Sequence, residues 1–158
     1  MGVAALRIES IEVGPERVEA LVHAAPSLER TSAVPGVAAR ALELLPGLAR
    51  HTCENGTAHG IVAELANTET AHLLEHVAVE CMALAGSPRT LRAETVWDFA
   101  RDGAHVYRVR TAYDVDLVAI GALRAGLGIV DWLMGDAAEK PDVEAIAAAL
   151  QRAHLRAD

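Results

Sequence analysis

Residues 68–88 read TETAHLLEHVAVECMALAGSP, and this stretch predicts a helix that organises the rest of the chain. Thr68 or Thr70 can supply the side-chain oxygen of an N-terminal cap. The run Gly86-Ser87-Pro88 predicts the end of the helix near Leu84, because glycine and proline commonly follow the last helical turn. The helix is expected to have one polar side and one apolar side.

Ionisable side chains gather on one side of this predicted helix, within an arc of roughly 140° at 100° per residue. They are His72, Glu75, His76 and Glu80. The order His-x-x-Glu-His is the one that inverted zinc hydrolases place on a helix. His72 and His76 lie one turn apart and can bind the same Zn²⁺ through neutral imidazole nitrogens. Glu75 is expected to act as general base on a zinc-bound water, whose pKa the metal lowers to about 7.

A catalytic zinc needs a third protein ligand and one position open to water. Glu80, one turn beyond His76, is the first choice, although its carboxylate must reach back about 6 Å along the helix axis. Other residues that offer a ligand atom are His51, Cys53, His59 and Glu94. His51 and Cys53 also fit a buried structural pair, and His59 fits an exposed loop side chain.

The remaining segments carry a mixture of strand and helix signals. Strands are predicted at residues 5–13, 91–99 and 105–113, with a brief strand at 49–53 and an ambiguous run at 18–23. Helices are predicted at residues 35–45, after the Asn55-Gly56 turn to Ala66, from Asp114 or Asp116 to Met134, and from Pro141 to about Ala153. Asp102-Gly103 predicts a hairpin turn between the last two strands. The order predicts a two-layer α+β domain, with a small, mostly antiparallel sheet packed against helices and the metal motif on a central helix.

Length and composition favour one domain spanning residues 1–158. Hydrophobic residues make up 52% and aromatic residues 3%, so alanine, leucine, valine and isoleucine are expected to form the core. The net charge of −8 would repel a phosphate backbone, so nucleic acid is not an expected partner. Cys53 and Cys81 are too few for a disulfide scaffold.

The sequence carries no signal that predicts export or membrane insertion. The N-terminal residues MGVAALR lack the basic segment and long apolar run of a signal peptide, so a cytoplasmic location is expected. The most apolar stretch, residues 115–134, contains Asp116, Arg124 and Asp131 and therefore predicts a helix packed on the domain. The oligomeric state stays open, a homo-oligomer included.

Several short motifs in a fixed order carry a resemblance to a known family. They are Pro35-Gly36, Leu45-Pro46-Gly47-Leu48, His51-x-Cys53, Gly56, Thr68, His72-x-x-Glu75-His76-Val77-Ala78-x-Glu80, Leu84-Ala85-Gly86 and Arg89-Thr90. Together these motifs resemble the N-terminal domain of cyanophycin synthetase over roughly residues 5–135.

The resemblance implies an α+β domain that in some members is a zinc-dependent hydrolase cutting the aspartate-arginine polymer into primers, and in others only holds the polymer. It implies His72, His76 and Glu80 as zinc ligands and Glu75 as the catalytic carboxylate. The family domain is normally followed by two ATP-dependent ligase modules, so this chain is not expected to synthesise polymer by itself. Residues 57–60 and 87–92 depart from the family pattern, which leaves the substrate open.

Arg89 and Arg92 follow the predicted metal helix and can bind a substrate carboxylate, or they are ordinary surface cations near a helix end. The leading hypothesis is a zinc hydrolase that cleaves peptide or isopeptide bonds in a peptide or polypeptide, with an Asp/Arg-type polymer as one candidate. The alternative is a non-catalytic module that binds such a polymer or serves as partner subunit of a separate ATP-dependent peptide ligase. A third hypothesis is a structural metal site.

Overall fold

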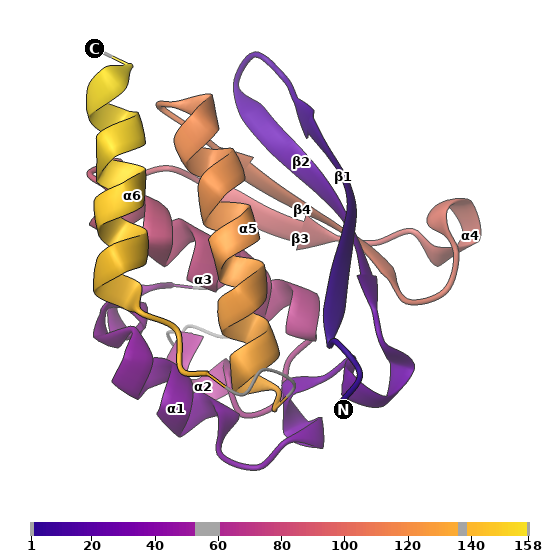
Figure 1. The fold of residues 1–158 in the computed structure, drawn as a ribbon. Helices are drawn as coiled ribbons and strands as arrows, with labels where there is room; N and C mark the ends of the chain where they lie inside the picture. The colour runs from indigo at the N-terminus through magenta and orange to yellow at the C-terminus, as the bar shows by residue number, and fades with distance from the viewer. Residues whose placement is uncertain (1, 53–60, 136–138, 158) are drawn as a thin grey trace.

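The structure is a computed structural model that describes residues 2–52, 61–135 and 139–157 (Figure 1). Its strands are β1 (Leu6–Val13), β2 (Arg17–Ala24), β3 (Ala93–Val96) and β4 (Val106–Ala112). Its helices are α1 (Val37–Leu44), α2 (Ile61–Glu64), α3 (Thr70–Leu84), α4 (Phe99–Asp102), α5 (Asp116–Leu133) and α6 (Val143–Arg156). Short 3₁₀ turns lie at Pro26–Leu28, Thr31–Ala33 and Pro46–Arg50.

The four strands form one antiparallel sheet in the order β1-β2-β4-β3. Alternation along β2 places Val18, Ala20 and Val22 on the inner face of the sheet, where each is fully buried. The run at 18–23, whose pattern is ambiguous in the sequence, is therefore a central strand. The predicted α+β class with a small antiparallel sheet is confirmed.

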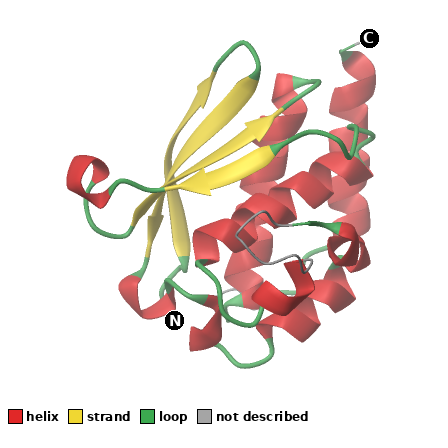
Figure 2. Ribbon diagram, turned by 180° about the vertical axis from the view of Figure 1, so that it is seen from behind, coloured by secondary structure: helices red, strands yellow, loops and turns green. Residues whose placement is uncertain are grey.

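Helix α3 lies in the middle of the molecule, in contact with β3 and β4 on one side and with α5 and α6 on others (Figures 1 and 2). Gly126 of α5 allows the close approach of the two helices, since a Cβ at this position would lie 3.1 Å from Leu74 Cδ1. Most of α3 is buried, including the ionisable residues on its polar side. The predicted polar side therefore faces other parts of the protein and a groove rather than open solvent.

The N-terminus of α3 differs from its prediction. The cap position is Glu69, and no side chain caps the helix there. The hydroxyl of Thr68 instead lies 2.8 Å from His72 Nδ1, and that of Thr70 donates to the Leu28 carbonyl at 2.6 Å. Both threonines are used for contacts with other groups, so the prediction that one of them caps α3 is wrong.

Two other predicted elements are also corrected. The brief strand expected at 49–53 is a 3₁₀ turn as far as Arg50, because Pro46 starts a tight turn, and Cys53 lies outside the described residues. The segments around β3 and β4 do pair antiparallel, but no two-residue hairpin joins them. Helix α4 fills the connection, with Asp98 as its N-terminal cap, so β3 ends before residue 99. His105, at φ 67°, completes the return to β4.

The two C-terminal helices, α5 and α6, follow their predictions closely. Helix α5 begins at Asp116 and ends one residue before Met134, and α6 is capped by Asp142, whose side chain accepts from the Ala145 amide at 3.0 Å. Within the described part of the chain, no helix combines the length and the apolar character needed to cross a membrane.

Candidate functional site

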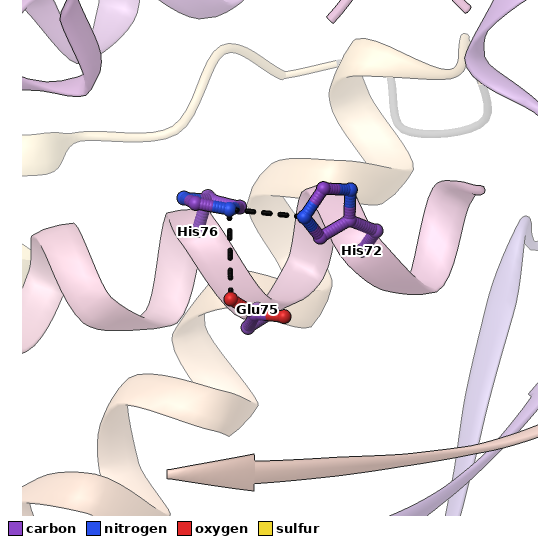
Figure 3. A group of neighbouring side chains, drawn as sticks. All are labelled: His72, Glu75 and His76. Atoms are coloured by element: carbon purple, nitrogen blue, oxygen red, sulfur yellow. Dashed lines mark hydrogen bonds and ion pairs between the residues drawn. The ribbon is translucent and has the colours of Figure 1, made fainter. Parts of the chain in front are cut away.

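Three ionisable side chains of α3 converge on one point (Figure 3). The Nε2 atoms of His72 and His76 lie 3.0 Å apart, and Glu75 Oε2 lies 3.5 Å from His76 Nε2. The i and i+4 spacing of the two histidines places them on one face, and Glu75 joins them from the adjacent turn. The exposed fractions are only 5%, 6% and 5% in sequence order, so the three groups interact in a shielded environment.

Burial keeps both imidazoles of the site neutral. It lowers the pKa of His72, against the opposing influence of Glu64 and Glu69. Burial, followed by the neighbouring rings of His72 and His51, lowers the pKa of His76 to about 3. A neutral imidazole carries one lone pair, which is the form that binds a metal.

The geometry of the three groups fits a zinc ion. Ligands of a tetrahedral zinc at about 2.0–2.1 Å lie roughly 3.3 Å from one another. The separation of 3.0 Å between His72 Nε2 and His76 Nε2 is close to that value. Imidazole nitrogens are ligands that zinc commonly takes, and Glu75 Oε2, 3.5 Å from His76 Nε2, lies beside them in a position suited to a base for metal-bound water.

A chain of hydrogen bonds behind His76 fixes which of its nitrogens faces this point. His51 Nε2 lies 2.9 Å from Glu80 Oε1, and His51 Nδ1 lies 3.0 Å from His76 Nδ1. A neutral His51 that donates from Nε2 to the carboxylate has only a lone pair at Nδ1, so it accepts from His76 Nδ1–H. We therefore assign the remaining lone pair of His76 to Nε2, the atom that faces His72 and Glu75.

His72 has an equivalent partner at the start of the helix. The hydroxyl of Thr68 lies 2.8 Å from His72 Nδ1 and can accept a hydrogen bond from it. That tautomer leaves the lone pair of His72 on Nε2, opposite the lone pair of His76. Two lone pairs facing each other at 3.0 Å repel, and a cation between them removes the repulsion.

The structure does not bring Glu80 to the point where the other three groups meet. Its carboxylate accepts from Arg89 Nη1 at 2.8 Å and from Nη2 at 3.2 Å, in addition to the bond from His51. A Cβ on Gly47 would lie 2.0 Å from Glu80 Oε2, so this glycine leaves the space that the carboxylate occupies. Glu80 is thus connected to the site indirectly: it is hydrogen-bonded to His51, and His51 is hydrogen-bonded to His76.

The charge state of Glu80 follows from these partners. Burial acts to raise the pKa of this carboxyl group, but hydrogen bonds from His51 and Arg89 hold the pKa below its usual value. Glu80 is therefore ionised at neutral pH, which supports its role as hydrogen-bond acceptor for His51. Both nitrogens of His51 are occupied by His76 and Glu80, so His51 also lies behind the site.

Glu75 has the opposite electrostatic environment. Burial raises its pKa to about 7, the charge of Glu94 adds to the shift, and a hydrogen bond from Thr95 opposes it. The Thr95 hydroxyl donates to Glu75 Oε1 at 2.8 Å, which leaves Oε2 directed toward His76. A carboxyl group with a pKa near neutrality can both accept and release a proton at physiological pH.

A groove of about 860 Å³ opens in front of these residues, between α3 and the segment 89–97 that contains β3. One water molecule takes about 30 Å³ of liquid volume, so the groove has ample room for water and for a ligand. His72, Glu75 and His76 line its wall, together with both predicted carboxylate binders, Arg89 and Arg92.

The two arginines differ in their surroundings. Arg89 directs both of its terminal nitrogens to Glu80 and is therefore part of the support behind His51. Arg92 is an exposed residue of the groove wall. The predicted role of a substrate-carboxylate binder thus fits Arg92 better than Arg89.

The other candidate ligands lie away from the convergence point or beyond the described residues. Glu94 is an ion-pair partner of Arg17 and Arg110 at 3.2 and 3.1 Å. Cys53 and His59 fall in the undescribed segment 53–60. Cys81 is fully buried, and burial raises the pKa of its thiol to about 12, as expected of an unreactive core cysteine.

Sequence reasoning missed the partners that support the site. Thr95 contacts Glu75 across 20 positions of sequence, and His51 contacts His76 across 25. Metal-binding histidines usually have a hydrogen-bond partner on the ring nitrogen that does not bind the metal. This rule predicts a partner for each histidine, but it does not identify Thr68 or His51 as that partner.

A comparison with protein-family models identifies one family that matches this chain. The model of the cyanophycin synthase-like N-terminal domain matches residues 19–135, which include most of β2, the whole of α3 and every residue of the convergence point. A search of curated proteins found no match. The matched segment covers well over half of the 158 residues, and the chain therefore belongs to the family of cyanophycin synthase-like N-terminal domains.

Proposed function

We propose that this protein is a zinc-dependent hydrolase that cleaves peptide or isopeptide bonds. The observation that carries the proposal is the convergence of His72 Nε2, His76 Nε2 and Glu75 Oε2 on one wall of a groove with room for water. Belonging to a family named after cyanophycin synthase supports an Asp/Arg-type peptide polymer as the candidate substrate.

Each residue of the site would have a distinct task. When bound, zinc would polarise the scissile carbonyl group and make water more acidic. His72 and His76 would hold the ion through their Nε2 lone pairs. Their outer nitrogens would stay hydrogen-bonded to Thr68 and His51, which keeps both rings in the tautomer that binds metal.

Glu75 would transfer the proton. Hydrolysis adds the oxygen of water to the carbonyl carbon and delivers a proton to the departing nitrogen. Glu75 Oε2 would accept a proton from water and pass it to that nitrogen as the carbon–nitrogen bond breaks. Its raised pKa, about 7, suits both transfers at neutral pH.

The sequence predicts Glu80 as the third zinc ligand. To bind the metal, its carboxylate would have to give up its hydrogen bonds with Arg89 and His51. We propose instead that it orients His76 through His51. Arg92, exposed on the groove wall, would attract a carboxylate of the substrate.

The test is zinc content together with hydrolysis of a panel of Asp/Arg peptides, with α-peptide and isopeptide linkages both represented. We expect near one zinc per chain, and Glu75→Gln should retain zinc while kcat falls about 10²–10⁴-fold, the usual contribution of a general base. Glu16→Gln, which changes an exposed acidic residue of the same groove wall, is the matched control and should retain activity. Full activity in metal-free protein would overturn the proposal.

The alternative is a non-catalytic module that holds a peptide polymer or joins an ATP-dependent ligase. The family description, which names a synthase rather than a hydrolase, favours this candidate. Peptides that bind the zinc-loaded protein but stay intact after prolonged incubation would support the module over the hydrolase.

A further inference from the structure

Strand β3 forms one edge of the sheet and lies against α3, the helix that carries the proposed catalytic groups (Figures 1 and 2). It pairs with β4 on one side, and no strand in the described part of the chain pairs with its other side. The hydroxyl of Thr95, in the middle of β3, donates to Glu75 Oε1 at 2.8 Å. This bond fixes the strand edge next to the carboxylate.

The register of β3 and β4 determines which main-chain groups face outward. The amide of Ala112 donates to the Arg92 carbonyl at 2.8 Å, so Arg92 turns its main chain toward β4. In a regular antiparallel ladder every second residue does the same, which adds Glu94 and Val96. The N–H and C=O groups of Ala93 and Thr95 therefore point away from β4.

The outward groups of β3 and the catalytic groups share one groove. Residues 93–97 line it together with His72, Glu75 and His76. A row of N–H and C=O groups at alternate residues matches the main chain of an extended peptide, whose own groups repeat with the same period. Unpaired strand edges are sites where another chain adds readily.

We propose that an extended polypeptide binds in this groove as an additional strand on β3, held by main-chain hydrogen bonds to Ala93 and Thr95. The scissile carbonyl of the bound segment then lies beside Glu75, the residue to which Thr95 is already bonded. Cleavage of the bound segment rests on the proposed hydrolase function, whereas binding of the segment as a strand on β3 does not require cleavage. The substrate class is an unfolded or extended segment, because a folded domain has no free main-chain row to offer.

The first test measures amide hydrogen exchange by nuclear magnetic resonance. The probe is the tightest-binding octapeptide selected from a random octapeptide library on the zinc-loaded Glu75→Gln protein, which binds without cleaving. In the free protein the amides of Ala93 and Thr95 should exchange fast and that of Glu94 slowly. Peptide binding should slow Ala93 and Thr95 at least tenfold and leave Glu94 unchanged. Equal protection of all three, or no octapeptide that binds, would overturn the proposal.

The second test removes single donors from the peptide. N-methylation of the probe at consecutive positions should weaken binding at every second residue, about fivefold or more per lost hydrogen bond, and have little effect between. Uniform weakening would contradict strand pairing. On the protein side, Ala93→Pro removes an N–H that does not take part in the β4 ladder, and edge strands tolerate proline. It should weaken peptide binding while zinc affinity and melting temperature stay near those of the unmodified protein.

The outcomes separate this inference from the hydrolase proposal. Alternating effects on binding, with no cleavage by the protein that retains Glu75, would keep the strand pairing and reject the hydrolase. Cleavage without alternation would keep the hydrolase and reject the pairing. If Ala93→Pro fails to fold, the peptide N-methylation series still decides the question, because it uses unmodified β3.

Discussion

The outer face of the sheet and the polar side of α3 both carry connected charged groups, but their partners differ. On the outer face, Arg110 Nε lies 2.6 Å from Glu19 Oε2, and Arg108 bonds Asp102 at 2.8 Å as well as Glu19. Burial acts to raise the pKa of Glu19, yet the bonds from Arg110 and Arg108 lower it. These carboxylates stay ionised and tie β2, β4 and α4 together.

On α3 the corresponding carboxylate has a neutral partner. Glu75 accepts from the Thr95 hydroxyl, and its burial raises the pKa to about 7. Arginine pairing thus produces a permanently charged structural group, whereas burial beside a hydroxyl produces a group that exchanges protons near neutral pH. Glu80, bonded to Arg89, resembles the outer-face carboxylates although it lies on the same helix as Glu75.

The largest expected effect comes from removing a histidine of the convergence point. His76→Ala should abolish stoichiometric zinc binding, since it removes one of two imidazole ligands and the link to His51. His23→Ala, on the outer face of β2 beside Glu9, should leave zinc content unchanged. Metal analysis of dialysed protein measures both. Equal zinc content in the two variants would place the metal elsewhere.

A smaller loss of zinc should follow from Glu80→Gln. If this carboxylate acts through His51, zinc affinity should fall about 10–100-fold, the usual cost of losing an outer-shell partner. Glu16→Gln, at an exposed position between β1 and β2, should have no such effect. Competition with a chelating dye gives the affinities. A loss as complete as that of His76→Ala would instead identify Glu80 as a ligand.

The space around Glu80 can be tested without changing any charge. In Gly47→Ala the new Cβ would lie 2.0 Å from Glu80 Oε2, and we expect destabilisation of about 1–3 kcal/mol, the cost of overpacking. Gly128→Ala is the control, because a Cβ there meets nothing within 4 Å and alanine favours helix α5 by about 0.5–1 kcal/mol. Urea denaturation measures both. Destabilisation by Gly128→Ala as well would show that the effect is not local to Glu80.

The smallest effect should come from the outer face and should depend on pH. The folded-state pKa of Glu19 lies below the reference value of 4.5, so its contribution to stability is present above that value and disappears as pH falls through the folded pKa. Glu19→Gln should therefore lower stability at pH 7 by roughly 0.5–1 kcal/mol and have no effect at strongly acidic pH. Urea titrations across this range give the difference. Glu12→Gln, at an exposed position of β1, should show no such trend.

Local patterns predicted most of the helices and the pairing of the site histidines. The spacing of His72 and His76 is a property of one helix, so the sequence sufficed to place them together. Helix α5 and the strand β1 likewise follow from periodicity and from the breaks at their ends. Helix α4 was missed because Asp102-Gly103 also fits a tight turn, and a four-residue helix carries little periodicity.

Contacts between distant segments could not be predicted. The position of Glu80 one turn past His76 made it the preferred ligand, but Arg89 and His51 hold its carboxylate on the other side of the His76 ring. To bind the same metal, the Glu80 carboxylate would have to reach back about 6 Å along the helix axis, and this distance already counted against it as a ligand. Thr95 offered no signal, because a threonine in a strand is common for reasons of β-propensity alone.

The most direct test of the central claim is zinc K-edge X-ray absorption on the zinc-loaded protein. We expect scattering from two imidazoles with zinc–nitrogen distances of about 2.0–2.1 Å, and loss of this signal in His72→Ala. A spectrum without imidazole scattering, or one that His72→Ala leaves unchanged, would contradict the claim that this helix holds the metal.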